Sequence, residues 1–126
     1  MTTLTVEEIK TERTRAQDAI NGLQRQKTMY LEERRISIAE FNEISATQGR
    51  MQNKLNELNV LLVERTIEDI LVNDDSPGAL LGLSITRLEE AVDQLDNIRK
   101  FFESAASFIN ALNVIIGVLA SLPIVV

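Results

Sequence analysis

Acidic residues gather around one predicted turn, and they are the first candidates for chemistry in this sequence. They are Glu64, Glu68, Asp69, Asp74, Asp75, Glu89, Glu90, Asp93 and Asp96. Carboxylates at this density could hold a cation or a basic partner. The turn itself lacks the oxygen ligands at alternate positions that a helix–loop–helix calcium site needs. We therefore expect a solvated acidic tip rather than a metal site.

Cysteine and histidine are absent from all 126 residues. Disulfides and thiolate chemistry are therefore excluded, and so are the commonest general base and the Glu-x-x-His motif of di-iron bundles. No phosphate-binding glycine loop or nucleophile elbow is present. We expect no catalytic residue, no cofactor and no metal, and predict that the chain is not an enzyme. The net charge of −6 argues against a nucleic-acid partner, because such affinity comes largely from phosphate neutralisation.

The element that carries most of the charges is a predicted long helix. Over residues 5–72, which contain no proline, apolar residues recur in alternating steps of four and three. This heptad pattern predicts one amphipathic helix, starting at a Thr5–Glu8 capping box and weakest at Gly22 and Gly49. The predicted coiled-coil seam consists of Ile9, Ala16, Ile20, Leu23, Tyr30, Phe41, Ile44, Met51, Leu55, Leu58 and Leu62.

Basic residues interrupt this seam at three core-like positions, Arg13, Lys27 and Arg34. We expect their aliphatic stems to pack in the seam while the charges reach solvent or pair with glutamates of a neighbouring helix. The alternative is a contact with anionic lipid headgroups or with an acidic partner helix.

A second helix follows the strongest turn signal, which lies in 73–83 and includes Pro77 and Gly78. The second helix is predicted over 84–122, is apolar on nearly every face from residue 105, and ends before Pro123. A short connection makes the two helices antiparallel neighbours. The sequence thus predicts one all-α unit over 1–126, a long antiparallel helical hairpin or coiled coil with an apolar C-terminal helix end.

The two predicted helices differ in length, so Leu122 would lie beside residue 35. Roughly the first 30 residues would then have no partner within the chain. An amphipathic helix needs a surface on which to pack. We therefore predict a homo-oligomer, with another helical protein as a possible partner.

The segment Ser104–Val126 contains no charged residue, and Arg99 and Lys100 come just before it. Its length suffices to span a bilayer, and its small residues let helices approach closely. Alternatively, it is buried at the centre of a soluble oligomer, with Asn110 and Asn113 hydrogen-bonded across it. The residues predicted to form this membrane or oligomer interface are Phe101, Phe102, Ala105, Phe108, Ile109, Asn110, Leu112, Asn113, Ile115, Ile116 and Leu119.

This plan, a long amphipathic helix joined to an apolar segment, resembles helical pore-forming toxin components and the translocator and tape-measure proteins of secretion systems and phage tails. The resemblance covers the architecture only, and it implies entry of the apolar segment into a membrane. Here the apolar segment lies at the C-terminal end rather than in an internal hairpin.

Two functional hypotheses follow. In the first, which we favour at this point, a self-associating coiled-coil protein inserts its apolar C-terminal helix into a membrane or is anchored by it, with lipid as a partner. In the second, a soluble structural or adaptor protein uses the same helix as an obligate interface. The N-terminus does not resemble a signal peptide. The expected location is thus a membrane, or otherwise the cytoplasm or a secreted or virion assembly.

Overall fold

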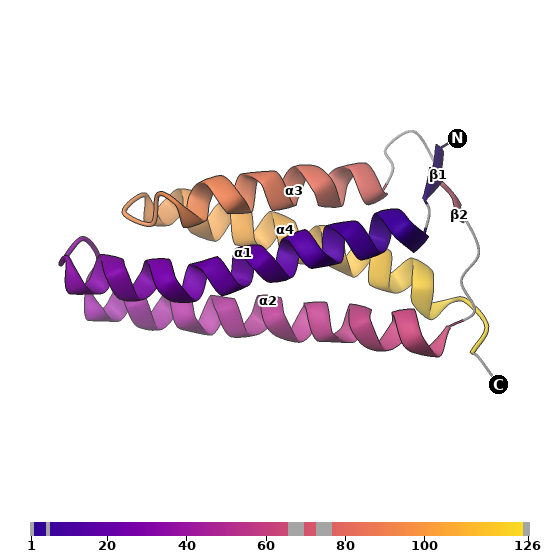
Figure 1. The fold of residues 1–126 in the computed structure, drawn as a ribbon, viewed down its shortest axis with the longest axis horizontal. Helices are drawn as coiled ribbons and strands as arrows, with labels where there is room; N and C mark the ends of the chain where they lie inside the picture. The colour runs from indigo at the N-terminus through magenta and orange to yellow at the C-terminus, as the bar shows by residue number, and fades with distance from the viewer. Residues whose placement is uncertain (1, 5, 66–69, 73–76, 125–126) are drawn as a thin grey trace.

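The structure, a computed structural model, describes residues 2–4, 6–65, 70–72 and 77–124. These residues form four α-helices, α1 (Val6–Glu32), α2 (Ile38–Glu64), α3 (Pro77–Val92) and α4 (Ile98–Ala120). Two short strands, β1 (Thr2–Leu4) and β2 (Ile70–Val72), pair antiparallel beside the N-terminal end of α1 (Figure 1). The all-α prediction is confirmed, and the C-terminal helix is the apolar one.

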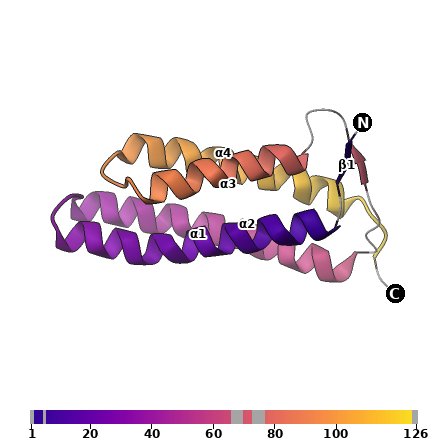
Figure 2. The same ribbon diagram turned by 45° about the horizontal axis from the view of Figure 1, so that its top comes forward.

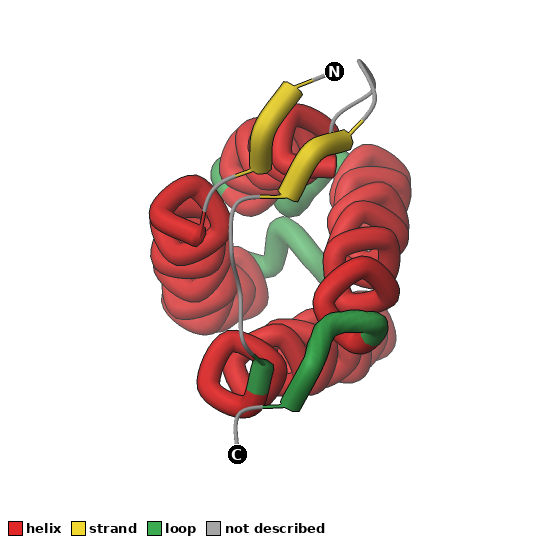
Figure 3. Tube along the Cα trace, turned by 90° about the vertical axis from the view of Figure 1, so that its right-hand side faces the viewer, coloured by secondary structure: helices red, strands yellow, loops and turns green. Residues whose placement is uncertain are grey.

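The helices surround one core at the corners of a square, in the order α1, α2, α4, α3 (Figure 3). The chain reverses direction from α1 to α2 and again from α3 to α4, as Figure 2 shows, so each of these pairs is an antiparallel hairpin. Helices α1 and α3 run parallel, since Arg15 of α1 binds Glu89 of α3 at 2.8 Å and Arg35, just after α1, binds Asp96, just after α3. Helices α2 and α3 lie at opposite corners of the bundle.

The predicted helix over 5–72 is wrong in its continuity, because the chain turns back at residues 33–37. Arg34 adopts a left-handed conformation with φ 60°. Its N–H donates to the Leu31 carbonyl at 3.0 Å, and the N–H of Arg35 donates to the Tyr30 carbonyl at 2.8 Å. These two bonds form a Schellman motif that closes α1. The Arg35 guanidinium lies 4.1 Å above the Tyr30 ring and supplies the side-chain contact that usually accompanies this motif.

A capping box starts the returning helix. The Glu40 N–H donates to Ser37 Oγ at 3.0 Å, and the Ser37 N–H donates to Glu40 Oε1 at 2.8 Å. The chain does not reverse at the predicted weak points, since Gly22 lies inside α1 and Gly49 inside α2. The Thr5–Glu8 capping box includes Thr5, which lies outside the described residues.

The predicted helix over 84–122 is likewise divided, at residues 93–97. Its first part, α3, already begins at Pro77, within the predicted turn 73–83; residues 73–76 of that turn lie outside the described part. Asn97 caps α4, accepting a hydrogen bond at Oδ1 from the Lys100 N–H at 3.3 Å. The two turns lie at the same end of the bundle, joined by the 2.8 Å pair of Arg35 with Asp96. This hydrogen bond holds the pKa of the Asp96 carboxyl below its ordinary value.

The heptad seam forms the core of this bundle. Nine predicted seam residues are buried, namely Ile9, Ala16, Ile20, Leu23, Tyr30, Ile44, Met51, Leu55 and Leu58. Phe41 and Leu62 are half-buried and pack against the same core. The helical period of the pattern is therefore correct in both α1 and α2, although the chain reverses between these helices.

The predicted position of Leu122 is wrong. Its carbonyl accepts a hydrogen bond from Arg65 Nη1 at 3.1 Å, so the end of α4 lies beside the end of α2 and not beside residue 35. Because α1 packs against both α2 and α3, the first 30 or so residues do have partners within the chain. The reason given above for a homo-oligomer therefore no longer applies.

Candidate interaction face on the C-terminal helix

The acidic residues of the predicted tip do not form one site. Glu64 ends α2 at one end of the bundle, whereas Asp93 and Asp96 lie at the other end, beside Arg35. Glu68, Asp69, Asp74 and Asp75 lie outside the described residues. Within the described part of the chain, no group of three or more acidic side chains is placed to hold a metal ion.

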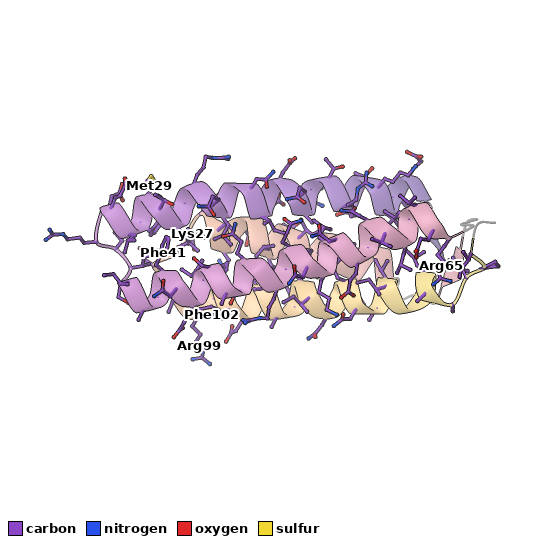
Figure 4. The ribbon with its side chains drawn as sticks, turned by 90° about the horizontal axis from the view of Figure 1, so that it is seen from below. Lys27, Met29, Phe41, Arg65, Arg99 and Phe102 are labelled. Atoms are coloured by element: carbon purple, nitrogen blue, oxygen red, sulfur yellow. The ribbon has the colours of Figure 1, made fainter. Side chains whose placement is uncertain are left out.

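The three basic seam residues lie in different environments. Arg13 is half-buried, Arg34 is exposed in the first turn, and Lys27 is buried with only 6% of its surface exposed. Lys27 Nζ donates to Ser45 Oγ at 2.9 Å and lies 5.1 Å from the centre of the Phe41 ring (Figure 4). No described carboxylate lies within 4 Å of this ammonium group. Burial lowers the pKa of Lys27.

We expect Lys27→Met to stabilise the bundle by about 1–2 kcal/mol at neutral pH, because it removes a buried charge that has no counter-ion. Ser45 Oγ keeps its own hydrogen bond to the Phe41 carbonyl, so no polar group loses its only partner. Between the lowered pKa of Lys27 and the unfolded value of about 10.5, the unfolded chain binds more protons. The wild-type free energy of unfolding therefore rises with pH through that window.

Urea unfolding across alkaline pH measures both effects. Lys10→Met, at an exposed site on the same helix, is the control and should change stability by less than about 0.5 kcal/mol. A destabilised Lys27→Met variant would contradict the assignment of Lys27 as an uncompensated buried charge.

Helix α4 turns its large apolar side chains inward. Of the residues predicted to form a membrane or oligomer interface, Phe101, Ala105, Phe108, Leu112, Ile115 and Leu119 are at most 1% exposed within the single chain. Phe102, Ile109 and Ile116 are half-buried at the flanks of this face. Asn110 and Asn113 are exposed. The predicted interface thus divides into a core face and an outer face.

The outer face of α4 carries no charge from Ser104 onward, although it is exposed. It consists of small or uncharged residues, Ala106, Ser107, Asn110, Asn113, Val114, Gly117 and Ala120. The exposed faces of the other three helices carry Asp, Glu, Lys or Arg. Even the exposed Val60 and Val63 of α2 have Glu57 and Glu64 as neighbours on their helix. A lack of charged residues is typical of the centre of a protein interface.

A groove of about 310 Å³ runs along this face between α3 and α4. Its apolar part is formed by Leu80, Leu83 and Val114, each about half exposed, and Arg87 closes one side. Leu80 and Leu83 are not among the predicted interface residues, because both precede the predicted start of the second helix. The i,i+3 spacing of these two leucines, outside the buried stripe, is the signal that could have indicated a second apolar surface.

Helix α4 is also, among the described residues, the one helix that is long and apolar enough to cross a membrane, with a mean hydropathy of 1.6. Only 33% of this apolar window is buried within the bundle. With this geometry in place, comparison with known proteins gives no further guide, since no protein family, curated protein or solved structure matches this chain.

Proposed function

We propose that this chain is a non-enzymatic assembly protein, a helical bundle that self-associates in water through the outer face of α4 and the groove beside it. The observation that supports the proposal is the distribution of side chains around α4. Its large apolar residues pack inside the bundle, and from Ser104 onward its exposed residues are small or uncharged. A lipid-facing helix needs large apolar residues outside, whereas close contact between helices needs small ones.

A second copy of the chain is the partner that the uncharged face of α4 permits. Each copy carries a net charge of −6, so two copies repel through most of their surfaces. The outer face of α4 is the part that adds no charge to that repulsion. Asn110 and Asn113 each offer a donor and an acceptor, so identical amides can hydrogen-bond across a twofold axis. The interface is therefore self-complementary in charge and in hydrogen bonding.

The mass of the purified protein in detergent-free buffer tests this proposal. Light scattering across a concentration series should give a defined oligomer of the 14.1 kDa chain that dissociates on dilution. A monomer at all concentrations up to the millimolar range would rule out self-association as the function.

Membrane insertion of α4 is the second candidate, and the observation in its favour is the hydropathy and length of this helix. Insertion requires α4 to leave the bundle, which a cross-link prevents. Arg65 and Ile124 form an antiparallel bridge, so their Cα atoms are close enough for a disulfide in the variant Arg65→Cys/Ile124→Cys. Because the chain has no cysteine of its own, this lock is specific.

Flotation with anionic phospholipid vesicles separates the two candidates. If α4 inserts, the reduced variant floats with the vesicles and the oxidised variant stays at the bottom. If the chain assembles in water, as we propose, neither form floats and both keep the wild-type oligomer mass.

A further inference from the structure

We propose that two copies of this chain can also exchange α1, by straightening the first turn so that residues 6–64 become one continuous helix. In the exchanged dimer, α1 of each copy packs on α2 and α3 of the other. Three features of the first hairpin lead to this inference: the register of its seam, the conformation of its turn, and the exposed apolar residues beside that turn.

The register of the seam is continuous across the turn. Buried residues of α1 and α2 are separated by whole heptads, as for Tyr30 and Ile44, or Ile20 and Leu55. No glycine or proline lies between Gly22 and Gly49. A straight helix over 6–64 would therefore present all of these residues on one stripe about 90 Å long. The chain can keep its seam in either form.

In the second hairpin the centre of the core face does not keep this register, although Ala91 is separated by whole heptads from Ala105 and Leu112. From Leu88 and Leu95 the heptad count leads to Phe102, but the buried residue of α4 is Phe101. A straight helix through residues 93–97 would rotate the core face of α4 by about 100° and bring Arg99 toward the seam. The second turn is therefore required by the seam, whereas the first is not.

The first turn also holds a conformation that only glycine adopts freely. Arg34 is left-handed, with φ 60°, and no other described non-glycine residue has a positive φ. A side chain in this region is strained by its Cβ atom. A continuous helix removes this strain and replaces the turn hydrogen bonds of the Arg34 and Arg35 N–H groups with helical ones.

Two exposed apolar side chains flank the turn, and one of them, Ile38, gains contacts in the exchanged dimer. Met29 is 41% exposed and Ile38 is 71% exposed. Ile38 follows Ser37 and takes an e position, which borders the heptad seam, whereas Met29 precedes Tyr30 and takes a c position, farther from the seam. In a straight helix that pairs antiparallel with a second copy, Ile38 borders the helix of that copy. The four charges between Met29 and Ile38, Glu32, Glu33, Arg34 and Arg35, sum to zero and allow the approach.

Contacts that now lie within one chain become contacts between chains. The amides of Gln17 and Gln52 exchange hydrogen bonds of 2.8 and 3.0 Å across α1 and α2, and Tyr30 Oη donates to the Asp93 carbonyl at 2.8 Å. An exchanged dimer keeps these hydrogen bonds, so the free-energy cost of forming it from two closed chains is mainly that of association.

The variant Gln17→Cys/Gln52→Cys, treated with a short bis-maleimide, reports which form is present. In the closed chain the cross-link is intramolecular, and denatured chains migrate as monomers. In the exchanged dimer it joins two chains. A dimer formed through the outer face of α4 alone gives monomers in this assay, so the exchange is measured independently of the proposed function.

Turn variants should shift the exchange in opposite directions after refolding at high protein concentration. Ser37→Ala removes the cap of α2 and favours a continuous helix, so the dissociation constant of the exchanged dimer should fall about 100-fold. Arg34→Gly relieves the strain of the turn and weakens a continuous helix, so this constant should rise on the order of 100- to 1,000-fold. Asn97→Ala removes the cap of α4, at the second turn, and should change it less than about threefold.

Two results would overturn the inference. One is the absence of interchain cross-links in the wild-type background and in Ser37→Ala at the highest concentration reached. The other is a fall in the dissociation constant for Asn97→Ala as large as that for Ser37→Ala, which would make the dimer a consequence of general destabilisation.

Discussion

Phe108→Ala should lower the free energy of unfolding by about 3–5 kcal/mol in water without detergent. Phe108 is fully buried at the centre of α4 and is among the largest buried side chains of the chain. Its truncation leaves a cavity between α4 and its neighbours, α2 and α3. For a chain of this size the loss corresponds to a fall in melting temperature of roughly 10–20 °C. Thermal unfolding followed by circular dichroism measures it.

Val114→Ala is the matched control, because Val114 lies on the same helix and is 48% exposed. Its effect on stability should be within about 0.5 kcal/mol. Equal stability of the two variants would mean that α4 does not pack into a bundle in water. The proposal of a soluble assembly would then be wrong, and the membrane-insertion candidate would gain support.

The second large effect concerns association rather than folding. Val114→Lys places a positive charge on the outer face of α4. In a symmetric interface this charge meets either a neutral surface or the same introduced charge on the second chain. Like charges or unpaired buried charges at an interface cost several kcal/mol. We therefore expect the dissociation constant of the oligomer to rise at least about 100-fold, with the helical content unchanged.

Val60→Lys provides the comparison, since Val60 is an equally exposed valine (53%) on α2, away from the proposed interface. It should leave the dissociation constant within about threefold, given the small effect of charges outside an interface. Sedimentation velocity at several concentrations measures both variants. Loss of the oligomer in Val60→Lys as well would place the interface elsewhere or show that net charge alone controls association.

The heptad pattern predicted the core well because its period depends only on which residues are apolar. Leu23, Ile44 and Met51 are buried as expected. The pattern carries no information on where the chain reverses, since its register is the same on both sides of the first turn. A glycine would have marked the left-handed position, but Arg34 occupies it. The remaining signal is Ser37 followed by Glu40, a capping box that lies inside the predicted long helix.

The second reversal did leave a trace in the sequence. The apolar stripe of α3 leads to Phe102, whereas the residues buried in α4 belong to a neighbouring stripe that includes Phe101, Phe108 and Leu112. A shift of one residue between two stripes indicates a break between them.

Hydropathy could not reveal the role of α4. The same phenylalanines and isoleucines serve a membrane helix and a core helix, and the difference lies in which other helices cover them. Only the tertiary arrangement shows that the large side chains point inward and that Asn110, Val114 and Gly117 form the exposed face. The candidate interface therefore depended on the fold, although each of its residues was visible in the sequence.

The central claim, that the outer face of α4 contacts a second copy, is tested most directly by single cysteines at two helical glycines. Gly117 lies on that face and Gly49 on the exposed face of α2, and a Cβ atom added at either position meets nothing within 4 Å. Each variant is treated with a short bis-maleimide in detergent-free buffer. We predict dimers for Gly117→Cys and monomers for Gly49→Cys. Equal yields for the two variants, or dimers for Gly49→Cys alone, would contradict this account.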